Sequence, residues 1–291
     1  MADSNSSRRR ASPVALVLIS IASVQLGAGV AKTLFDEVDP TTVVWLRLAA
    51  SALVMLLLAR PTLRGRTRSD WATVLAFGAT LGLMNWSFYQ SFQRIPLGIA
   101  VTIEFVGPLT VAVLASRRRR DLVWVGLAAT GVLLLGLERA DLDPLGVAFA
   151  LLAGACWGAY ILISAETGRR WPGLDGLAVA SVIAAALVAP LALGRHADQL
   201  TETRVLALGV LVGLLSSVVP YTCELIALRS LPPSVFGILM SVEPAAAALV
   251  GMLVLTEFLS PVQWLAVACV VAACVGATRT APATARQPAP D

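Results

Sequence analysis

Charged residues are scarce in this 291-residue chain: they make up 14% of it, and its mean hydropathy is +0.80. A soluble globular domain carries about 25% charged residues, so the composition excludes an ordinary soluble domain. The deficit extends along nearly the whole chain, and no strict alternation of apolar and polar residues accompanies it. A membrane β-barrel would need that alternation. The sequence therefore predicts an all-α polytopic membrane protein.

Residues that commonly carry out catalysis are few as well. The sequence has one histidine, His196, and it contains no HExxH zinc motif, no cluster of aspartates and no ATP-binding P-loop. The spacing of the four cysteines suits no metal site, and buried thiols usually act as small apolar groups. These residues are Cys156, Cys223, Cys269 and Cys274. We therefore expect no enzyme, no metal and no cofactor.

Apolar stretches of roughly membrane-spanning length follow one another from end to end. A helix needs about 20 residues, at about 1.5 Å each, to cross ~30 Å of hydrocarbon. The expected spans are 13–34, 41–59, 71–92, 97–116, 122–137, 145–165, 174–194, 204–227, 233–255 and 261–278. The fifth is short at its charged edges. Residues 1–12 are expected to form a cytoplasmic tail, and 279–291 a disordered cytoplasmic tail.

The distribution of basic residues predicts the orientation of these spans. If the N-terminus is cytoplasmic, 16 of the 22 lysines and arginines fall on that side and five on the other, and Arg47 alone lies within a span. The positive-inside rule then favours ten spans with both ends in the cytoplasm. This bias accounts for the net charge of +4 without a nucleic-acid partner. The expected surroundings are a lipid bilayer, and the oligomeric state is unknown.

The two halves of the chain are similar. RIPLGIAVTIEFVGPL (94–109) aligns with SLPPSVFGILMSVEPA (230–245), so that Pro96 and Pro108 match Pro232 and Pro244 at one offset of 136. Five spans per half is an odd number, so the halves 13–137 and 144–278 would have opposite orientations. Inverted five-helix repeats recur in secondary transporters, whose substrate sites lie near the midplane between repeats. The alternative is a chance alignment of apolar sequence.

Ionisable residues inside the spans are the strongest functional candidates. A charge at the centre of a membrane helix costs about 2.5–3.5 kcal/mol on insertion scales, and Arg47, Glu104 and Glu243 are all expected well inside spans. A zwitterionic amino acid needs a partner for each of its charges in a low dielectric. Arg47 could bind the carboxylate, and Glu104 or Glu243 the ammonium. A permanent Arg47–Glu104 ion pair, or a Glu243 that only assists packing, are the alternatives.

Other polar, aromatic and helix-breaking residues are expected around the same central cavity. Those expected to line the substrate or proton pathway are Gln25, Asn85, Tyr89, Trp157, Tyr160 and Tyr221. The expected helix breaks lie at Pro108, Pro220 and Pro244, because broken helices are tolerated where they line a cavity. Simple kinks are the alternative. Lys32, Glu224 and Glu257 lie near helix ends and are expected to anchor or pair locally.

Several stretches resemble a known family. SVQLGAGVAKTLF (23–35), PLGIAVTIEFVGPLTVAVLASRR (96–118), GACWGAYIL (154–162) and PYTCELIALRSLPPSVFGILMSVEPAAAALVGM (220–252) are similar to the EamA-like branch of the drug/metabolite transporter superfamily. The resemblance implies ten helices in two inverted halves. It also implies export of a small metabolite across the bacterial inner membrane. It is strongest to the threonine and homoserine exporters of that branch. One departure is Thr256, where many relatives have glycine before the glutamate.

The expected function is therefore secondary export of small amino acids similar to threonine and homoserine. Without an ATP-binding motif the energy must come from a gradient, and proton antiport is favoured because a desolvated carboxylate such as Glu243 is suited to carry a proton. The alternative is an exporter or facilitator of another small metabolite or drug. A non-transporting sensor fits less well, because the loops are too short for an output domain. A membrane enzyme lacks the motifs.

Overall fold

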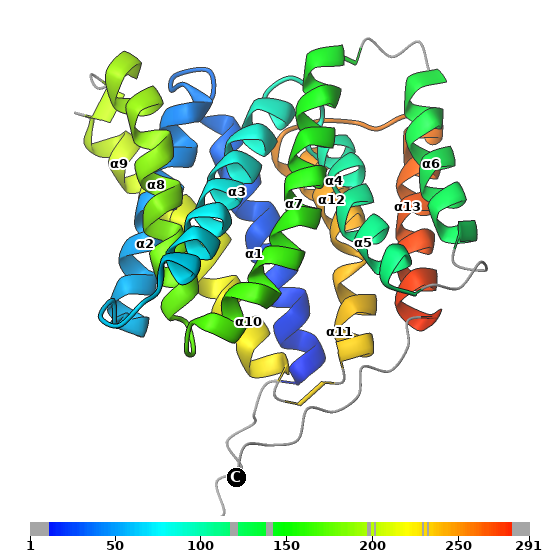
Figure 1. The fold of residues 1–291 in the computed structure, drawn as a ribbon. Coiled ribbons are helices and arrows are strands. Elements are labelled where there is room, and N and C mark those ends of the chain that lie inside the picture. The colour runs from blue at the N-terminus through cyan, green and yellow to red at the C-terminus, as the bar shows by residue number, and fades with distance from the viewer. Residues whose placement is uncertain are drawn as a thin grey trace, which may run out of the picture.

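The computed structural model describes residues 12–116, 122–137, 142–196, 199–200, 202–228, 230–231 and 233–280 (Figure 1). The long regular elements in these ranges are all helices, which confirms the all-helical prediction. They are α1 Pro13–Thr33, α2 Pro40–Ala59, α3 Arg68–Phe92, α4 Leu97–Glu104, α5 Val106–Ser116, α6 Leu122–Leu137, α7 Pro144–Arg170, α8 Asp175–His196, α9 Thr203–Gly213, the π-helix η3 Leu214–Val218, α10 Val219–Leu228, α11 Pro233–Met240, α12 Glu243–Val254 and α13 Pro261–Thr280.

Eight helices or runs of consecutive helices in the described ranges are long and apolar enough to cross a membrane. They coincide with eight of the ten predicted spans, so the protein crosses the membrane many times. The other two predicted spans, 71–92 and 122–137, fold as α3 and α6. The 25-residue α3 carries many polar side chains, and α6 has only 16 residues. The arrangement of ten spans thus remains a prediction.

Helices begin where the sequence provides capping groups. The Asp39 carboxylate accepts a hydrogen bond from the Thr41 amide at 2.7 Å and caps α2. At the start of α3, Thr67 and Asp70 form a reciprocal capping box. Proline occupies the first position of α1, α2 and α7, where its missing N–H costs nothing. These caps fix the helix ends on either side of the bundle.

The helices of the first half pack against those of the second (Figure 1). The packed pairs are α3 with α7 and α8, α2 with α8 and α9, α1 with α10 and α12, α4 with α12, and α6 with α13. The first helix begins and the last ends on one side of the bundle, which we name the Pro13 end. The opposite side, where α1 finishes, is the Lys32 end. The core therefore lies between the two halves.

Small residues allow these helices to approach closely. A Cβ atom added at Gly78 would lie 2.6 Å from the Cβ of Ile183 on α8, and one added at Gly209 would lie 2.5 Å from Leu46 on α2. At Gly154 the added atom would lie 2.6 Å from the Glu104 carbonyl oxygen. Small residues at these positions therefore let the helix backbones approach closely, as they do in other membrane bundles.

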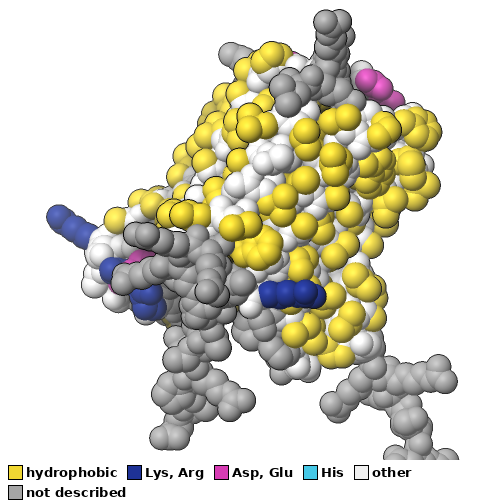
Figure 2. Space-filling model, turned by 90° about the vertical axis from the view of Figure 1, so that its right-hand side faces the viewer, with side chains coloured by type: hydrophobic (Ala, Val, Ile, Leu, Met, Phe, Trp, Pro, Cys, Tyr) yellow, Lys and Arg dark blue, Asp and Glu magenta, His cyan; other side chains and the backbone are white. Residues whose placement is uncertain are grey.

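The outer surface is apolar. Figure 2 shows the face formed by α6 and α13, on which hydrophobic side chains cover most of the visible surface. Large apolar side chains are widely exposed, including Leu114 at 75%, Leu133 at 66% and Leu253 at 76%. Apolar surface on this scale is unusual for a soluble monomer and suits contact with lipid.

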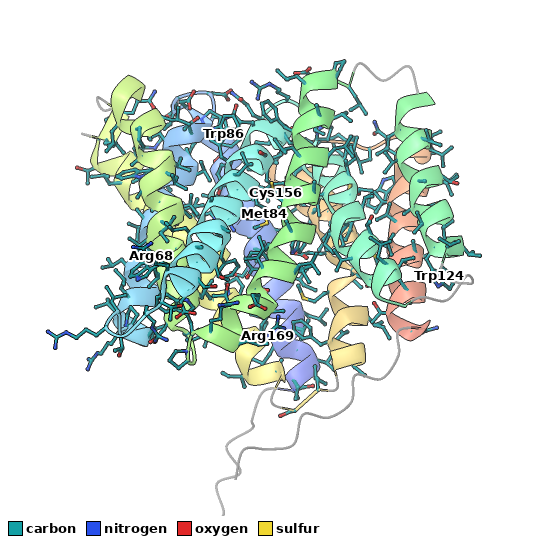
Figure 3. All side chains as sticks on the ribbon, in the orientation of Figure 1. Arg68, Met84, Trp86, Trp124, Cys156 and Arg169 are labelled. Atoms are coloured by element: carbon teal, nitrogen blue, oxygen red, sulfur yellow. The ribbon has the colours of Figure 1, made fainter. Side chains whose placement is uncertain are left out.

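Basic side chains lie nearer the ends of the bundle. Arg68 and Arg169, for example, lie toward the Pro13 end (Figure 3).

Candidate functional site: a cavity between two broken helices

Two spans are interrupted near their middle. In the first half, α4 ends at Glu104 and α5 begins at Val106. In the second half, α11 ends at Met240 and α12 begins at Glu243. Proline has no amide hydrogen, so Pro108 leaves the Glu104 carbonyl without its donor four residues later, and Pro244 does the same for the Met240 carbonyl. Each interruption thus combines a glutamate with a backbone carbonyl that lacks its usual helical donor.

A third proline follows a different irregularity. The π-helix η3 lies between α9 and α10, and the amide of Val219 donates to the Leu214 carbonyl five residues earlier. The buried Pro220 comes directly after it. A π-turn absorbs an extra residue, and such turns are frequent at functional sites. The Ser217 and Ser51 hydroxyls lie 2.5 Å apart and connect this irregular segment to α2.

A cavity of about 140 Å³ lies between the two interruptions. We call it the central cavity. It includes six of the nine predicted pathway residues: Gln25, Arg47, Asn85, Glu104, Trp157 and Glu243. The remaining lining residues are Val24, Ala28, Met84, Phe88, Val101 and Phe105. Met84 lies about midway between the two ends, whereas Trp86 is nearer the Lys32 end (Figure 3).

The three predicted tyrosines have different positions. Tyr89 is fully buried, and the guanidinium carbon of Arg47 lies 5.8 Å from the centre of its ring, within range of a cation–π contact. Tyr160 lies outside the central cavity: its ring is 5.1 Å from that of Phe77, and it lines a separate pocket beside Trp171. The side chain of Tyr221 lies outside the described residues.

Acceptor oxygens surround one side of the central cavity. Glu104 and Glu243 are each only 7% exposed. The Gln25 amide donates to Glu243 Oε1 at 3.3 Å. The second oxygen of Glu243 and the amide oxygen of Gln25 are buried and have no hydrogen-bond partner among the described residues. Such atoms are costly to leave unpaired. They are therefore available to a hydrogen-bond donor in the cavity.

The charges around the cavity do not neutralise one another by direct contact. The cavity is lined by one basic side chain, Arg47, and two acidic ones, Glu104 and Glu243. Among the ion pairs that the described side chains form, none joins Arg47 to Glu104. The structure thus places both residues at one cavity without the direct pair that the sequence raised as an alternative. One cation and two acids therefore line the same small space. Such a site can hold a molecule that carries both charges.

Two polar clusters lie outside the cavity, and in them residues near helix ends pair with partners far along the chain and not with the sequence neighbours that we expected. At the Lys32 end, Lys32 Nζ lies 2.5 Å from Glu257 Oε1 and donates to the Ile95 carbonyl at 2.8 Å, while Glu257 Oε2 accepts from the Leu97 amide at 2.8 Å. We call this the Lys32–Glu257 bridge. Toward the Pro13 end, Ser20 donates to Glu224 at 2.5 Å.

Sequence reasoning missed the apolar part of the site. Phe105 lies in the turn between α4 and α5, and its ring packs edge-on against Trp157 with the centroids 4.9 Å apart. In a chain that is 57% hydrophobic, nothing in the sequence separates one phenylalanine from the others. The only available signal was its position beside Glu104 and before Pro108.

The chain is similar to known membrane transporters. The EamA-like transporter family matches residues 11–137 and, separately, residues 144–279. The threonine/homoserine exporter RhtA of Escherichia coli (strain K12) is 42% identical over 271 residues, which is 92% of either chain. RhtA of Salmonella typhimurium (strain SL1344) is equally similar. The uncharacterized transporter YwfM of Bacillus subtilis (strain 168) is 29% identical over 68% of this chain and 71% of its own.

A solved crystal structure shares the fold. It superposes with a TM-score of 0.63, covers 94% of this chain and 98% of its own, and is 17% identical in sequence. At that identity the likeness concerns the arrangement of the helices alone.

Proposed function

Because the chain belongs to the EamA-like transporter family, we propose that it exports small amino acids of the threonine and homoserine type across the cytoplasmic membrane. Family membership makes it a multi-pass membrane transporter of a small molecule and not an enzyme. The observation that carries the substrate proposal is the central cavity, where Arg47 faces Glu104 and Glu243. The 42% identity to the RhtA exporters supports the same substrate class.

The size and charge of the cavity favour an amino acid over a drug. Drug-sized ligands occupy pockets of about 300–1,000 Å³, whereas this cavity holds about 140 Å³. The Arg47 guanidinium suits a carboxylate, which it can bind through two parallel hydrogen bonds. The unpaired oxygens of Glu243 and Gln25 suit an ammonium group. Both charges of a zwitterion are then paired in a low-dielectric site.

We also propose that the Pro13 end is cytoplasmic and that the chain forms two inverted repeats of five spans. Among the described side chains, the cations near this end outnumber those near the Lys32 end: the first are Arg60, Arg64, Arg66, Arg68, Arg169, Arg170 and Arg279, and the second are Lys32, Arg94 and Arg204. This bias is the one that cytoplasmic loops show. The two separate family matches and the matching interruptions at Glu104–Pro108 and Glu243–Pro244 support the repeats.

Proton antiport is the coupling that we propose. The Glu243 carboxylate can bind either a substrate ammonium or a proton. Both would occupy the same oxygens, so they compete. If so, the substrate leaves when the proton arrives, and a proton gradient drives export. The competing possibility is a facilitator in which Glu243 only binds the substrate.

Transport by purified protein in proteoliposomes tests the proposal. We expect an imposed proton gradient to drive accumulation of homoserine and threonine by the wild type, and Glu243→Gln to abolish that accumulation. Glu37→Gln is the matched control, because Glu37 is half-exposed at the Lys32 end. Equal transport rates with and without the proton gradient would contradict antiport. No flux of either amino acid would contradict the substrate class.

A further inference from the structure

A second cavity, of about 300 Å³, lies toward the Pro13 end between α5, α7, α11 and α13. It shares three lining residues with the central cavity: Phe105, Trp157 and Glu243. The edge-on ring pair of Phe105 and Trp157 and the Glu243 carboxylate therefore form a common wall between the two spaces. Both broken helices are interrupted beside this wall, α4–α5 at Phe105 and α11–α12 at Ser241 and Val242.

The second cavity is suited to one end of an amino acid only. Its polar side chains besides Glu243 include Ser241 and Thr278, whose hydroxyls donate to the carbonyls of Gly237 and Cys274 at 2.8 and 2.7 Å. A hydroxyl that donates its one proton can still accept hydrogen bonds. Both therefore offer acceptor oxygens, as Glu243 does. No arginine or lysine lines this cavity among the described residues.

We propose that the second cavity is a vestibule of the transport path, in which the substrate ammonium is first held by Glu243, Ser241 and Thr278. The Phe105–Trp157 ring pair then separates this vestibule from the site at which Arg47 binds the carboxylate. Glu243 borders both spaces, so the ammonium keeps one partner throughout the passage while the carboxylate gains its partner only in the central cavity. The ring pair limits the size of the side chain that passes. This inference rests on the proposed function.

Cysteine modification tests the vestibule. Thr278→Cys is made in a chain whose four native cysteines are replaced by alanine, and proteoliposomes are treated with a small neutral methanethiosulfonate. We expect modification to reduce threonine transport about tenfold, as for a blocked gate, relative to the same variant untreated. Threonine at about ten times its half-saturating concentration should slow the modification about tenfold. Thr62→Cys, in the exposed segment between α2 and α3 at the Pro13 end, is the control, and its modification should leave transport unchanged.

Trp157→Ala tests the ring pair without any cysteine. A smaller wall should raise the ratio of leucine to threonine transport by about tenfold, a typical discrimination for a pocket that reads size. An equal loss for both amino acids would show that the rings only pack, and would overturn their role. Modified Thr278→Cys that still transports, or reacts at one rate with and without threonine, would overturn the vestibule while wild-type flux upholds the proposed function. No threonine flux in the wild type would overturn both.

Discussion

The two ends of the broken helices are built differently. Toward the Lys32 end, α4 and α12 touch: a Cβ atom added at Gly98 would lie 2.6 Å from the Ala248 Cα atom. The Lys32–Glu257 bridge closes the same end, because it joins α1 and the start of α4 to the segment after α12. Toward the Pro13 end, α5 and α11 border a cavity of about 300 Å³.

This difference between the two ends indicates which contacts have to change during transport. Ion pairs at the Pro13 end also join the two halves, but Arg66–Asp175 and Arg170–Asp70 lie to one side, on the segments around α3, α7 and α8. Between α5 and α11 the described structure has space instead. A transporter that alternates between two open states must separate α4 from α12 before the Lys32 end can open. We call the interface of α4 with α12 the closed gate, because the proposed function requires this contact to open.

The largest effect is expected from a glycine at this gate. Gly98→Ala inserts a methyl group against the backbone of Ala248, so α4 and α12 must move apart. Overpacking of this kind typically costs about 1–3 kcal/mol. We expect a clear loss of thermal stability in detergent and a loss of threonine transport.

Gly237→Ala is the matched control on α11. There the added methyl group would meet a side-chain atom, Thr278 Cγ2, at 2.9 Å. Thr278 borders a cavity, so it has room to shift. Its effect on stability should be smaller than that of Gly98→Ala. Equal losses of stability in the two variants would remove the distinction between the ends.

A similar effect on stability, but a smaller one on transport, is expected from the Lys32–Glu257 bridge. Its two side chains are 17% and 16% exposed, so Lys32→Met leaves a mostly buried carboxylate unpaired. We expect a loss of about 3 kcal/mol, at the lower limit of what breaking a buried pair costs. Adding Glu257→Gln to Lys32→Met should restore part of the lost stability, because no carboxylate is then left without its cation. Thermal unfolding of the wild type, the two single variants and the double variant measures this in a double-mutant cycle.

The exposed pair at the same end serves as the comparison for the bridge. Arg204 and Glu37 are 64% and 50% exposed, and removing either should cost less than about 1 kcal/mol. If both pairs gave the same loss, the bridge would be an ordinary surface contact and not part of the closed gate.

The smallest effect is expected at Thr256, directly before the bridge. Its φ of +57° is a left-handed conformation that β-branched residues rarely adopt. Glycine at this position would relieve a strain of roughly 1–2 kcal/mol, but it would cost about 0.5–1 kcal/mol because the unfolded chain gains entropy. Thr256→Gly should therefore raise thermal stability slightly and leave transport unchanged. A loss of stability would mean that the threonine side chain makes a necessary contact.

The sequence predicted the helices better than the contacts between them. Hydropathy located the spans because each must cross the same thickness of hydrocarbon, and the prolines and glutamates indicated where spans four and nine break. The depth of a residue along a helix does not tell which way the helix is rotated, and so does not tell which neighbour its side chain faces. For this reason Tyr160 was expected in the central cavity but lies beside Phe77. The pairing of Arg47 with Glu104 was open for the same reason, since equal depth does not fix the distance between two side chains.

Binding of threonine to the purified protein tests the central claim most directly, because it requires neither a gradient nor a gate. Arg47→Gln removes the only cation that lines the central cavity among its described residues. Truncating one partner of a buried charge pair costs about 2–5 kcal/mol. We therefore predict that Arg47→Gln raises the dissociation constant for threonine at least ~30-fold. Arg94→Gln, at the Lys32 end, should leave it unchanged. Equal binding by the wild type and Arg47→Gln would contradict the assignment of this cavity as the substrate site.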